Sequence, residues 1–437
     1  MPCWRSILNK KRIVITGMSV CTPLGDRLDD FLEKLLAGQS AISRWKSIDT
    51  ERIYAKVGGD LGGYNVKQKI ADYENTIPET VYNRLKKLGN RFPLSIGLSM
   101  QLAVEACKDA NLFGHYSEED NNIATIISGH NLNKKHVFNN HDVFNDEPDF
   151  IDGLFALNGL DTHHLGTVTE TLQLKGPAYT VGAACASGNA ALKCGLDEIH
   201  LREAPIAVIV APILDFSPLD LHGMSLIGAI SIKSFNDAPE QASRPYDMRR
   251  EGFVPSPGAA VIVMEELTHA RARGAKIYAE VLGAATSSDG SHLPQPSQAG
   301  QVRLMKRLIG LCHIQPEDID FISAHATSTP LGDITEIRSI KEAFGAHAYK
   351  LKLNAPKSML GHTCWSSALV ELVAGVLQMQ TGKLHPSINI DNLDPEIDLD
   401  ICRGTAVTHP ITIMMNNSFG FGGLNSIAIL KQYEEHA

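Results

Sequence analysis

A cysteine inside a run of small residues is the first candidate for chemistry. Cys185 lies within Thr180-Val-Gly-Ala-Ala-Cys-Ala-Ser-Gly188, after a short β-favouring run and before apolar residues at helical spacing. The pattern predicts that Cys185 follows a strand and begins a helix. The free N–H groups at such a helix end would point at the sulfur, and the helix dipole would favour the nucleophilic thiolate. A buried cysteine that packs as a small apolar residue is the alternative interpretation.

Three segments in the second half of the chain contain possible partners for this cysteine. His325 directly follows a predicted strand, and open α/β sheets place catalytic groups at the carboxyl ends of strands. Lys357-Ser-Met-Leu-Gly-His362 precedes a predicted helix. The turn Asn417-Ser-Phe-Gly-Phe-Gly-Gly423 allows close backbone approach, so one of its N–H groups could join that of Cys185 in an oxyanion hole. Each segment alone is weak evidence, because the chain has 17 histidines and glycine-rich turns are common.

Together the four segments resemble the β-ketoacyl-acyl-carrier-protein synthases, or ketosynthases, of the thiolase superfamily, in order and in spacing. The resemblance covers essentially the whole chain. It implies an α/β fold of the thiolase type, with five layers (α-β-α-β-α) built from two related halves and usually assembled as a homodimer. We expect the half with the nucleophilic cysteine to span residues 1–270, and the half with the two catalytic histidines to span residues 271–437.

The resemblance implies a decarboxylative Claisen condensation. Cys185 would accept an acyl group from the phosphopantetheine arm of an acyl carrier protein, and a malonyl-carrier thioester would then lose CO₂ and attack that acyl group. His325 and His362, both neutral, would donate Nε2–H hydrogen bonds to the malonyl thioester oxygen. The backbone N–H groups of Cys185 and Phe421 would bind the acyl oxygen. Since the carrier delivers the arm, the resemblance implies no bound cofactor, and the sequence calls for no metal ion.

Further site residues follow from the same resemblance. Lys357 would hold the site electrostatically together with Glu371, and Phe421 would also act as a gate that admits malonyl only after acylation. Asp333 and Glu336 match the family's supporting carboxylates. The residues expected to contact the substrates are Thr327, Thr329, Phe419, Gly422, Trp365 and His292, the last of these in a loop similar to the family's second gating loop.

Several positions depart from the family's usual pattern and bear on the substrate. Ala326 replaces a glycine, and Trp365 begins the segment Trp-Ser-Ser-Ala where the family has a glycine-alanine-alanine-glycine run. Trp365 would either fill part of the acyl pocket or pack in an altered core. The loop after residue 128 lacks the usual glycine run, and His130 and Asn131 would make this region more filled and more polar.

Two segments, Phe155-Ala-Leu-Asn-Gly-Leu-Asp-Thr-His163 and Tyr179-Thr-Val-Gly-Ala-Ala184, resemble free-standing ketosynthases of polyketide pathways. We therefore expect a specialised pathway rather than general fatty-acid synthesis. A malonyl-carrier decarboxylase of the same fold is the main alternative. Such decarboxylases usually carry serine at the nucleophile position, and Cys185 therefore favours condensation. A non-catalytic chain-length subunit usually lacks the cysteine. A thiolase would use coenzyme A and a second cysteine near the C-terminus, which Cys402 resembles only superficially.

The composition fits a cytoplasmic enzyme and argues against several classes of partner. The formal charge of −9 gives no support for binding to nucleic acid or to an anionic membrane. The eight cysteines are scattered without a C-x-x-C pair, which argues against a zinc site or a disulfide framework and suits a reducing compartment. No apolar run reaches the roughly 18 residues of a membrane span. Residues 1–12 do not resemble a signal peptide.

Alternating strand and helix patterns must position these residues. Strands are predicted at 11–18, 123–128, 206–210, 259–264, 277–283, 320–324, 408–416 and 426–430, and the main helices at 28–36, 94–110, 299–311, 333–344 and 366–380. The alternation predicts helices that cover a mostly parallel sheet. Residues 130–150, rich in Asn, His and Asp, are expected to form a polar loop.

Overall fold

The computed structural model describes residues 11–89 and 91–435, and within these ranges its centre is an 11-stranded sheet. The strands of the first half are β1 (Ile13–Cys21), β4 (Ile123–Ser128), β5 (Ala178–Val181), β6 (Ile206–Ala211) and β7 (Ala259–Glu266). Those of the second half are β8 (Ala279–Ser288), β9 (Phe321–Ser323), β10 (Lys352–Asn354), β14 (Ile413–Gly420) and β15 (Leu424–Gln432). A short strand, β12 (Asp400–Ile401), extends the outer edge of the second half.

The two halves of the sheet have the same strand order. Along the sheet the order is β5-β4-β6-β7-β1 and then β8-β15-β14-β9-β10, with β12 outermost. If the strands of each half are numbered by their place in the chain, leaving out β12, both halves run third, second, fourth, fifth, first from the outer side of the sheet to its middle. In each half the fifth strand is antiparallel to both of its neighbours. The halves join where β1 pairs with β8, Val14 opposite Glu280. The expected duplication is confirmed, whereas the division between residues 270 and 271 stays a prediction.

The sheet is mixed rather than mostly parallel. β14 and β15 form a hairpin across Phe421-Gly-Gly423, in which Gly422 and Gly423 have φ angles of +81° and +70°. β7 lies antiparallel between β6 and β1. These antiparallel strands are buried on both faces along most of their length, so their sequences lack the alternation that marks a strand with one face in water. A continuous apolar run therefore did not distinguish the two directions.

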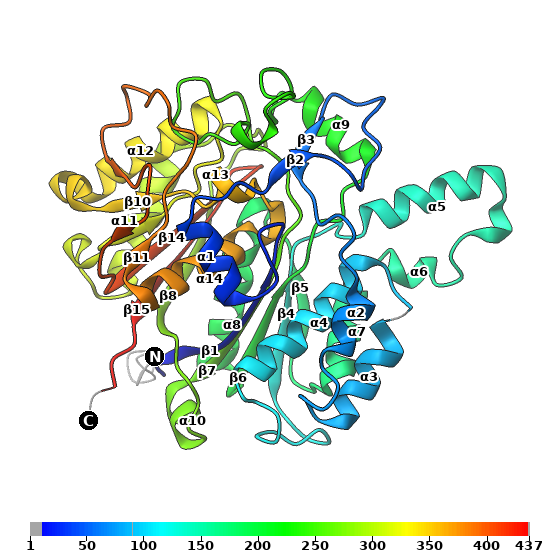
Figure 1. Cartoon of the computed structure of the whole chain (residues 1–437). Helices are drawn as coiled ribbons and strands as arrows, with labels where there is room; N and C mark the ends of the chain where they lie inside the picture. The colour runs from blue at the N-terminus through cyan, green and yellow to red at the C-terminus, as the bar shows by residue number, and fades with distance from the viewer. Residues whose placement is uncertain (1–10, 90, 436–437) are drawn as a thin grey trace.

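Helices form three layers around the two halves of the sheet (Figure 1). The middle layer contains α8 (Ser187–Leu201), which contacts β4 and β6 on one side and β8 and β15 on the other, and α14 (Ser367–Thr381), which contacts β7 and β14. α4 (Leu94–Asp109) covers the outer face of the first half, whereas α11 (Gln298–Leu311) covers β8 and β15 and packs against α12 (Pro330–Phe344). α14 is buried on all sides from residue 367 to residue 379. Because no side of the helix faces water, its sequence lacks the polar stripe of a surface helix. The five-layered α-β-α-β-α architecture is confirmed.

The remaining elements lie around this core. They are α1 (Leu28–Leu36), β2 (Ile42–Arg44), β3 (Val57–Gly59), α2 (Val66–Ala71), α3 (Glu79–Gly89), α6 (Phe155–Asn158), α7 (Thr162–Leu172), α9 (Pro218–Leu226), α10 (Leu267–Ala272), α13 (Lys357–Leu360), β11 (Lys383–Leu384) and β13 (Val407–Thr408). Across the described parts of the chain, no helix combines the length and the apolar composition that a membrane crossing needs.

The expected loop over residues 130–150 is wrong for most of its length, because Lys134–Asp146 forms the helix α5. No residue of α5 is buried, and the helix extends away from the body of the molecule (Figure 1). Its Asn, His and Asp residues have low helix propensity, which favoured the loop prediction. Val137 and Phe144 are seven residues apart, which is two helical turns, and this was the signal for a helix.

Candidate active site

Cys185 lies in a strained turn between β5 and α8. It belongs to the 3₁₀ turn Ala184–Ala186, and the preceding Ala184 has a φ angle of +47°, which is unfavourable for a residue with a side chain. Ser187 stabilises this turn, since its Oγ accepts from the Ala183 N–H at 2.8 Å and donates to the Ala184 carbonyl at 2.6 Å. The predicted strand-to-helix position is confirmed, and Cys185 is only 6% exposed.

Two backbone N–H groups converge on the cysteine sulfur, those of Cys185 itself and of Phe421. The β14–β15 hairpin reaches the turn because residue 420 is glycine. A Cβ there would lie 2.8 Å from the Ala183 carbonyl oxygen and 3.2 Å from the Cys185 nitrogen. Ser418 connects the same strand to the turn, as its Oγ donates to the Cys185 carbonyl at 2.7 Å. The pair of donors has the arrangement of an oxyanion hole.

Burial raises the pKa of the Cys185 thiol to about 11. The positive charge of Lys357 and the two N–H groups act in the opposite direction but do not compensate for the loss of solvent. The helix end favours the thiolate, as expected, but burial outweighs this effect and the thiol is the stable form of the free site. The sulfur is protonated at neutral pH, and its proton must leave during the reaction.

His362 faces the cysteine with a defined tautomer. Its Nε2 atom lies 3.2 Å from the Cys185 sulfur, and its Nδ1 accepts the backbone N–H of Cys364 at 3.1 Å. Burial and the nearby Lys357 lower the pKa of His362 well below its usual range, so the ring is neutral. Because Nδ1 accepts a hydrogen bond, the single ring proton is on Nε2, where it is directed at the reacting sulfur.

His325 stands beside His362, with ring centroids 5.6 Å apart and nearly perpendicular planes. Its Nδ1 lies 3.4 Å from the Nζ of Lys357, and its ring meets Phe419 edge to face at 5.8 Å. Burial, followed by the positive charge of Lys357, lowers the pKa of His325 well below its usual range. Both histidines are thus neutral, and a neutral imidazole still has one ring N–H with which to donate a hydrogen bond.

Lys357 and Glu371 form a buried ion pair behind the histidines. Both side chains are about 2% exposed. Burial raises the pKa of Glu371 to about 7, although the positive charge of Lys357 opposes that shift. The pair fixes the ammonium group that contacts His325 and contributes to keeping that ring neutral.

Two further carboxylates hold the loop after β9. Glu336 accepts the N–H groups of His325 and Ala326 at 3.0 and 2.8 Å, and the side-chain amide of Asn417 at 2.9 Å. Asp333 accepts the N–H groups of Tyr246 and Ser328 at 2.9 and 3.1 Å. Burial raises the pKa of Asp333 to about 7. The two carboxylates bind backbone rather than the reacting atoms, and thereby position His325.

A cavity of about 330 Å³ leads to these groups. Its lining includes Cys185, His325, His362, Thr327, Thr329, Phe419 and Phe421. Gly422, His292 and Trp365 are not among its lining residues, although each was expected to contact substrate. Sequence reasoning assigned no role to Phe253, which meets the His362 ring edge to face at 5.0 Å and lies 6.3 Å from the Phe421 ring. The proximity of Phe253 to the histidine required the structure.

Trp365 lies next to the nucleophile but outside this cavity. It belongs to the turn Cys364–Ser366, which contacts the Cys185 turn, and its ring stacks on His130 at a centroid distance of 4.7 Å. It also packs in the apolar cluster that contains Phe253 and Cys364. The interpretation that Trp365 packs in an altered core therefore agrees with the structure. Its turn also contacts the Cys185 turn, so the interpretation that it fills part of the acyl pocket stays a prediction.

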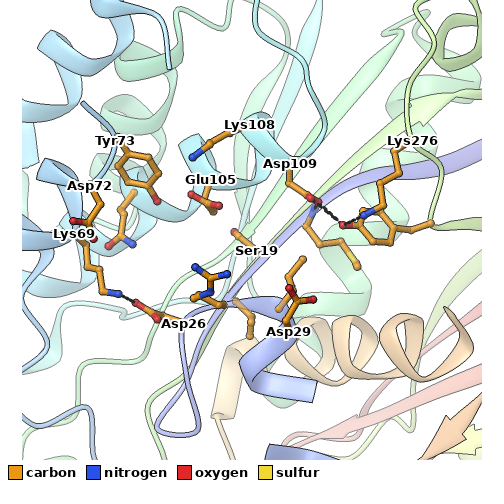
Figure 2. A pocket seen from close by; sticks show the side chains of 16 residues that line it. Ser19, Asp26, Asp29, Lys69, Asp72, Tyr73, Glu105, Lys108, Asp109 and Lys276 are labelled. Atoms are coloured by element: carbon orange, nitrogen blue, oxygen red, sulfur yellow. Dashed lines mark hydrogen bonds and ion pairs between the residues drawn. The ribbon is translucent and has the colours of Figure 1, made fainter. Parts of the chain in front are cut away.

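A second cavity, of about 520 Å³, lies between β1, the start of α1, α2 and α4 and shares no lining residue with the first (Figure 2). Two of its carboxylates have partners within the cavity. Lys69 pairs with Asp26 at 2.6 Å, and the Tyr278 hydroxyl lies 2.9 Å from Asp109. It contains no cysteine or histidine, so it provides no nucleophile of the kind found at Cys185. Among the residues that the structure describes, no cluster of His, Cys, Asp or Glu is placed to hold a metal ion.

Comparison with known proteins gives consistent matches over the chain. Residues 10–270 match the family model for the β-ketoacyl synthase N-terminal domain, and residues 278–391 match the C-terminal domain. The 3-oxoacyl-[acyl-carrier-protein] synthase 2 of Coxiella burnetii is 33% identical over 97% of this chain and 99% of the relative. A β-ketoacyl synthase structure from Burkholderia phymatum has a TM-score of 0.85 at 26% identity, covering 97% of this chain and all of the other. The ishigamide ketosynthase/chain length factor has a TM-score of 0.84 at 26% identity, with the same coverage.

Proposed function

Because the chain belongs to the β-ketoacyl synthase family and is an enzyme of the acyltransferase type, we propose that it is a β-ketoacyl-acyl-carrier-protein synthase. It joins an acyl group on Cys185 to a two-carbon unit from malonyl-carrier. One observation carries this proposal: the Cys185 sulfur, two neutral histidines and two backbone donors converge at one cavity.

The first step is acyl transfer to Cys185. The sulfur bonds to the carbonyl carbon of an acyl-carrier thioester, and the bond from that carbon to the pantetheine sulfur breaks. The N–H groups of Cys185 and Phe421 stabilise the oxyanion that forms between these events. The thiol proton passes to the released pantetheine sulfur, so the free carrier leaves as a thiol.

The second step is decarboxylation of malonyl-carrier. Its bond to the carboxylate breaks, CO₂ leaves, and the electron pair moves to the thioester enolate. His325 and His362 stabilise the enolate oxygen. Each neutral ring donates one N–H hydrogen bond to that oxygen. The enolate carbon attacks the acyl carbonyl, the Cys185 sulfur leaves and takes up a proton, and the β-ketoacyl-carrier is released.

A malonyl-carrier decarboxylase is the second candidate. Two observations favour it: the Cys185 thiol is protonated at neutral pH, and the aromatic rings of His130 and Trp365 pack beside the nucleophile. In this activity the enolate takes up a proton and leaves as acetyl-carrier, and Cys185 forms no thioester. The same two histidines serve both reactions.

The pathway and the assembly are part of the proposal. The departures at Ala326 and Trp365 favour a specialised polyketide-type pathway, and the likeness to a ketosynthase/chain length factor supports it. β5 lies at one end of the sheet, and α5 and the following turn expose Phe144 and Phe150. An edge strand without a second neighbour and a protruding helix with exposed aromatic residues both favour assembly as a homodimer. The cytoplasmic location stays a prediction.

Intact-mass spectrometry tests the function directly. The protein is incubated with a panel of acyl-carrier thioesters and then with malonyl-carrier. The expected result is an acyl adduct on Cys185 that disappears as a carrier-bound product two carbons longer forms. Acetyl-carrier formed from malonyl-carrier, without an adduct from any acyl donor, would replace condensation with the decarboxylase.

A further inference from the structure

The two substrates of a condensing enzyme must occupy different spaces around Cys185. The acyl group stays on the sulfur while the malonyl arm enters, and the cavity that reaches Cys185 has both histidines in its wall. The malonyl thioester must occupy that cavity, because its oxygen has to reach His325 and His362. The acyl chain therefore has to extend toward the other neighbours of the Cys185 turn, which include the turn Cys364–Ser366.

Two aromatic rings fill the region beside these turns. His130 and Trp365 stack with centroids 4.7 Å apart and an interplanar angle of 21°. Neither ring lines the cavity, yet each lies close to an active-site residue, Trp365 in the chain and His130 through its packing. Trp365 is three residues beyond His362 (365 − 362 = 3). His130 packs on Gly182, three residues before Cys185 (185 − 182 = 3), where a Cβ would lie 3.1 Å from the His130 ring.

The stack is held by packing, and the His130 Nδ1 also lies 3.5 Å from the side-chain nitrogen of Asn131. The Trp365 Nε1 is buried and has no hydrogen-bond partner. A Cβ on Gly129 would lie 3.1 Å from the Trp365 Cβ, so the backbone on this side also leaves little room. Burial lowers the pKa of His130, which keeps its ring uncharged beside the indole. Trp365 also packs against an apolar cluster that contains Phe253 and Cys364.

We propose that the stacked rings of His130 and Trp365 form the end wall of the acyl site and restrict the acyl donor to short chains. This inference rests on the proposed condensing function, because it concerns the acyl group that Cys185 carries. The wall is steric. A methylene that does not fit a closed apolar site reduces the reaction about tenfold or more, so the preference falls steeply with chain length.

The test measures the rate at which acetyl-, butyryl-, hexanoyl- and octanoyl-carrier acylate Cys185, by intact mass. In the wild type the hexanoyl rate is expected to be at least about 100-fold below the acetyl rate. Trp365→Ala should raise the ratio of the hexanoyl rate to the acetyl rate at least about tenfold, and His130→Ala should move it in the same direction. Trp45→Ala is the matched control, because Trp45 belongs to the same apolar cluster, contacts Phe216 and has no ring contact with His130.

The outcomes separate the wall from the condensing function. Wild-type protein that accepts octanoyl as fast as acetyl would overturn the wall, as would variants that accept acetyl but keep the wild-type chain-length ratio. A Trp45→Ala ratio that changes as much as that of Trp365→Ala would also overturn it. If the wild type accepts no acyl group from any carrier, the proposed condensing function is wrong. The two variants then decide whether the wall exists. Acylation gained by Trp365→Ala or His130→Ala supports the wall, and no gain in either overturns it. Should Trp365→Ala fail to fold, Trp365→Phe and His130→Ala provide the same comparison.

Discussion

The Nε2 atom of His362 points its proton at the Cys185 sulfur from 3.2 Å, because the backbone N–H of Cys364 occupies the other ring nitrogen. In this tautomer the ring donates a hydrogen bond and cannot also accept the thiol proton. His362 is therefore arranged to stabilise an oxyanion rather than to act as the base that activates the cysteine. A thiol with a raised pKa is compatible with this arrangement, because the thiol proton passes to the pantetheine sulfur during acyl transfer and no base has to remove it beforehand.

Replacing His362 with alanine should therefore impair decarboxylation more than acylation. The rate of CO₂ release from malonyl-carrier is expected to fall about 10²–10³-fold, the usual effect of losing one donor to a developing oxyanion. Acylation of Cys185 should fall less, since its oxyanion binds to backbone N–H groups. His115→Ala, at an exposed histidine outside the cavity, is the control. An equal loss in both half-reactions would argue for a base role instead.

Adding a methyl group at residue 420 should disrupt the backbone donors. The Cβ of Gly420→Ala would lie 2.8 Å from the Ala183 carbonyl oxygen, so the hairpin must move away from the cysteine turn. We expect the acylation rate to fall about 100-fold, because the Phe421 N–H then no longer reaches the reacting oxygen. Gly310→Ala is the control, since a Cβ there meets nothing within 4 Å. A Gly420→Ala enzyme with wild-type acylation would exclude the Phe421 N–H from this role.

Local patterns in the sequence singled out Cys185 and both histidines as candidates, since each follows or precedes a regular element, and the combined resemblance to one family joined them. The helix over residues 28–36 and the strand over residues 123–128 have the predicted bounds. The direction of β7 and β15 was not accessible in this way, because a strand buried on both faces reads the same in a parallel and in an antiparallel sheet.

Long-range effects account for the other differences. Solvent exclusion around Cys185 involves segments more than 100 residues away, such as His362 and Phe421. The helix end, which lowers the thiol pKa, therefore could not predict the net rise that burial causes. Trp365 was recognised as a large residue in a place for a small one. Its stacking on His130 joins positions 235 residues apart (365 − 130 = 235), and no local pattern contains that contact.

Removing the charge of Lys357 should destabilise the fold in a pH-dependent way. Lys357→Met leaves Glu371 buried without its cation, and the free energy of unfolding is expected to fall by about 3–5 kcal/mol. Burial already raises the pKa of Glu371 to about 7, and loss of the cation raises it further. The folded state then binds a proton that the unfolded state releases, so stability is retained at low pH and decreases as pH rises.

Urea unfolding at about pH 5.5 and about pH 8 measures both effects. Lys357→Met should lose more stability at the higher pH. The double variant Lys357→Met with Glu371→Gln has no buried carboxylate, so it should recover part of the loss and show a smaller pH dependence. A single variant whose loss is independent of pH would mean that the pair contributes packing rather than charge.

The raised pKa of Cys185 predicts an unusual pH profile for its alkylation. Only the thiolate reacts with iodoacetamide, and with a pKa of about 11 the thiolate fraction grows about tenfold per pH unit between about pH 7 and about pH 9. The rate at Cys185, followed by peptide mass spectrometry, should therefore rise across this range without a plateau. Cys194, which is half-buried, provides an internal comparison in the same samples. A Cys185 rate that is already constant at neutral pH would mean that the helix end and Lys357 outweigh burial, and the proton transfer in the acylation step would then be unnecessary.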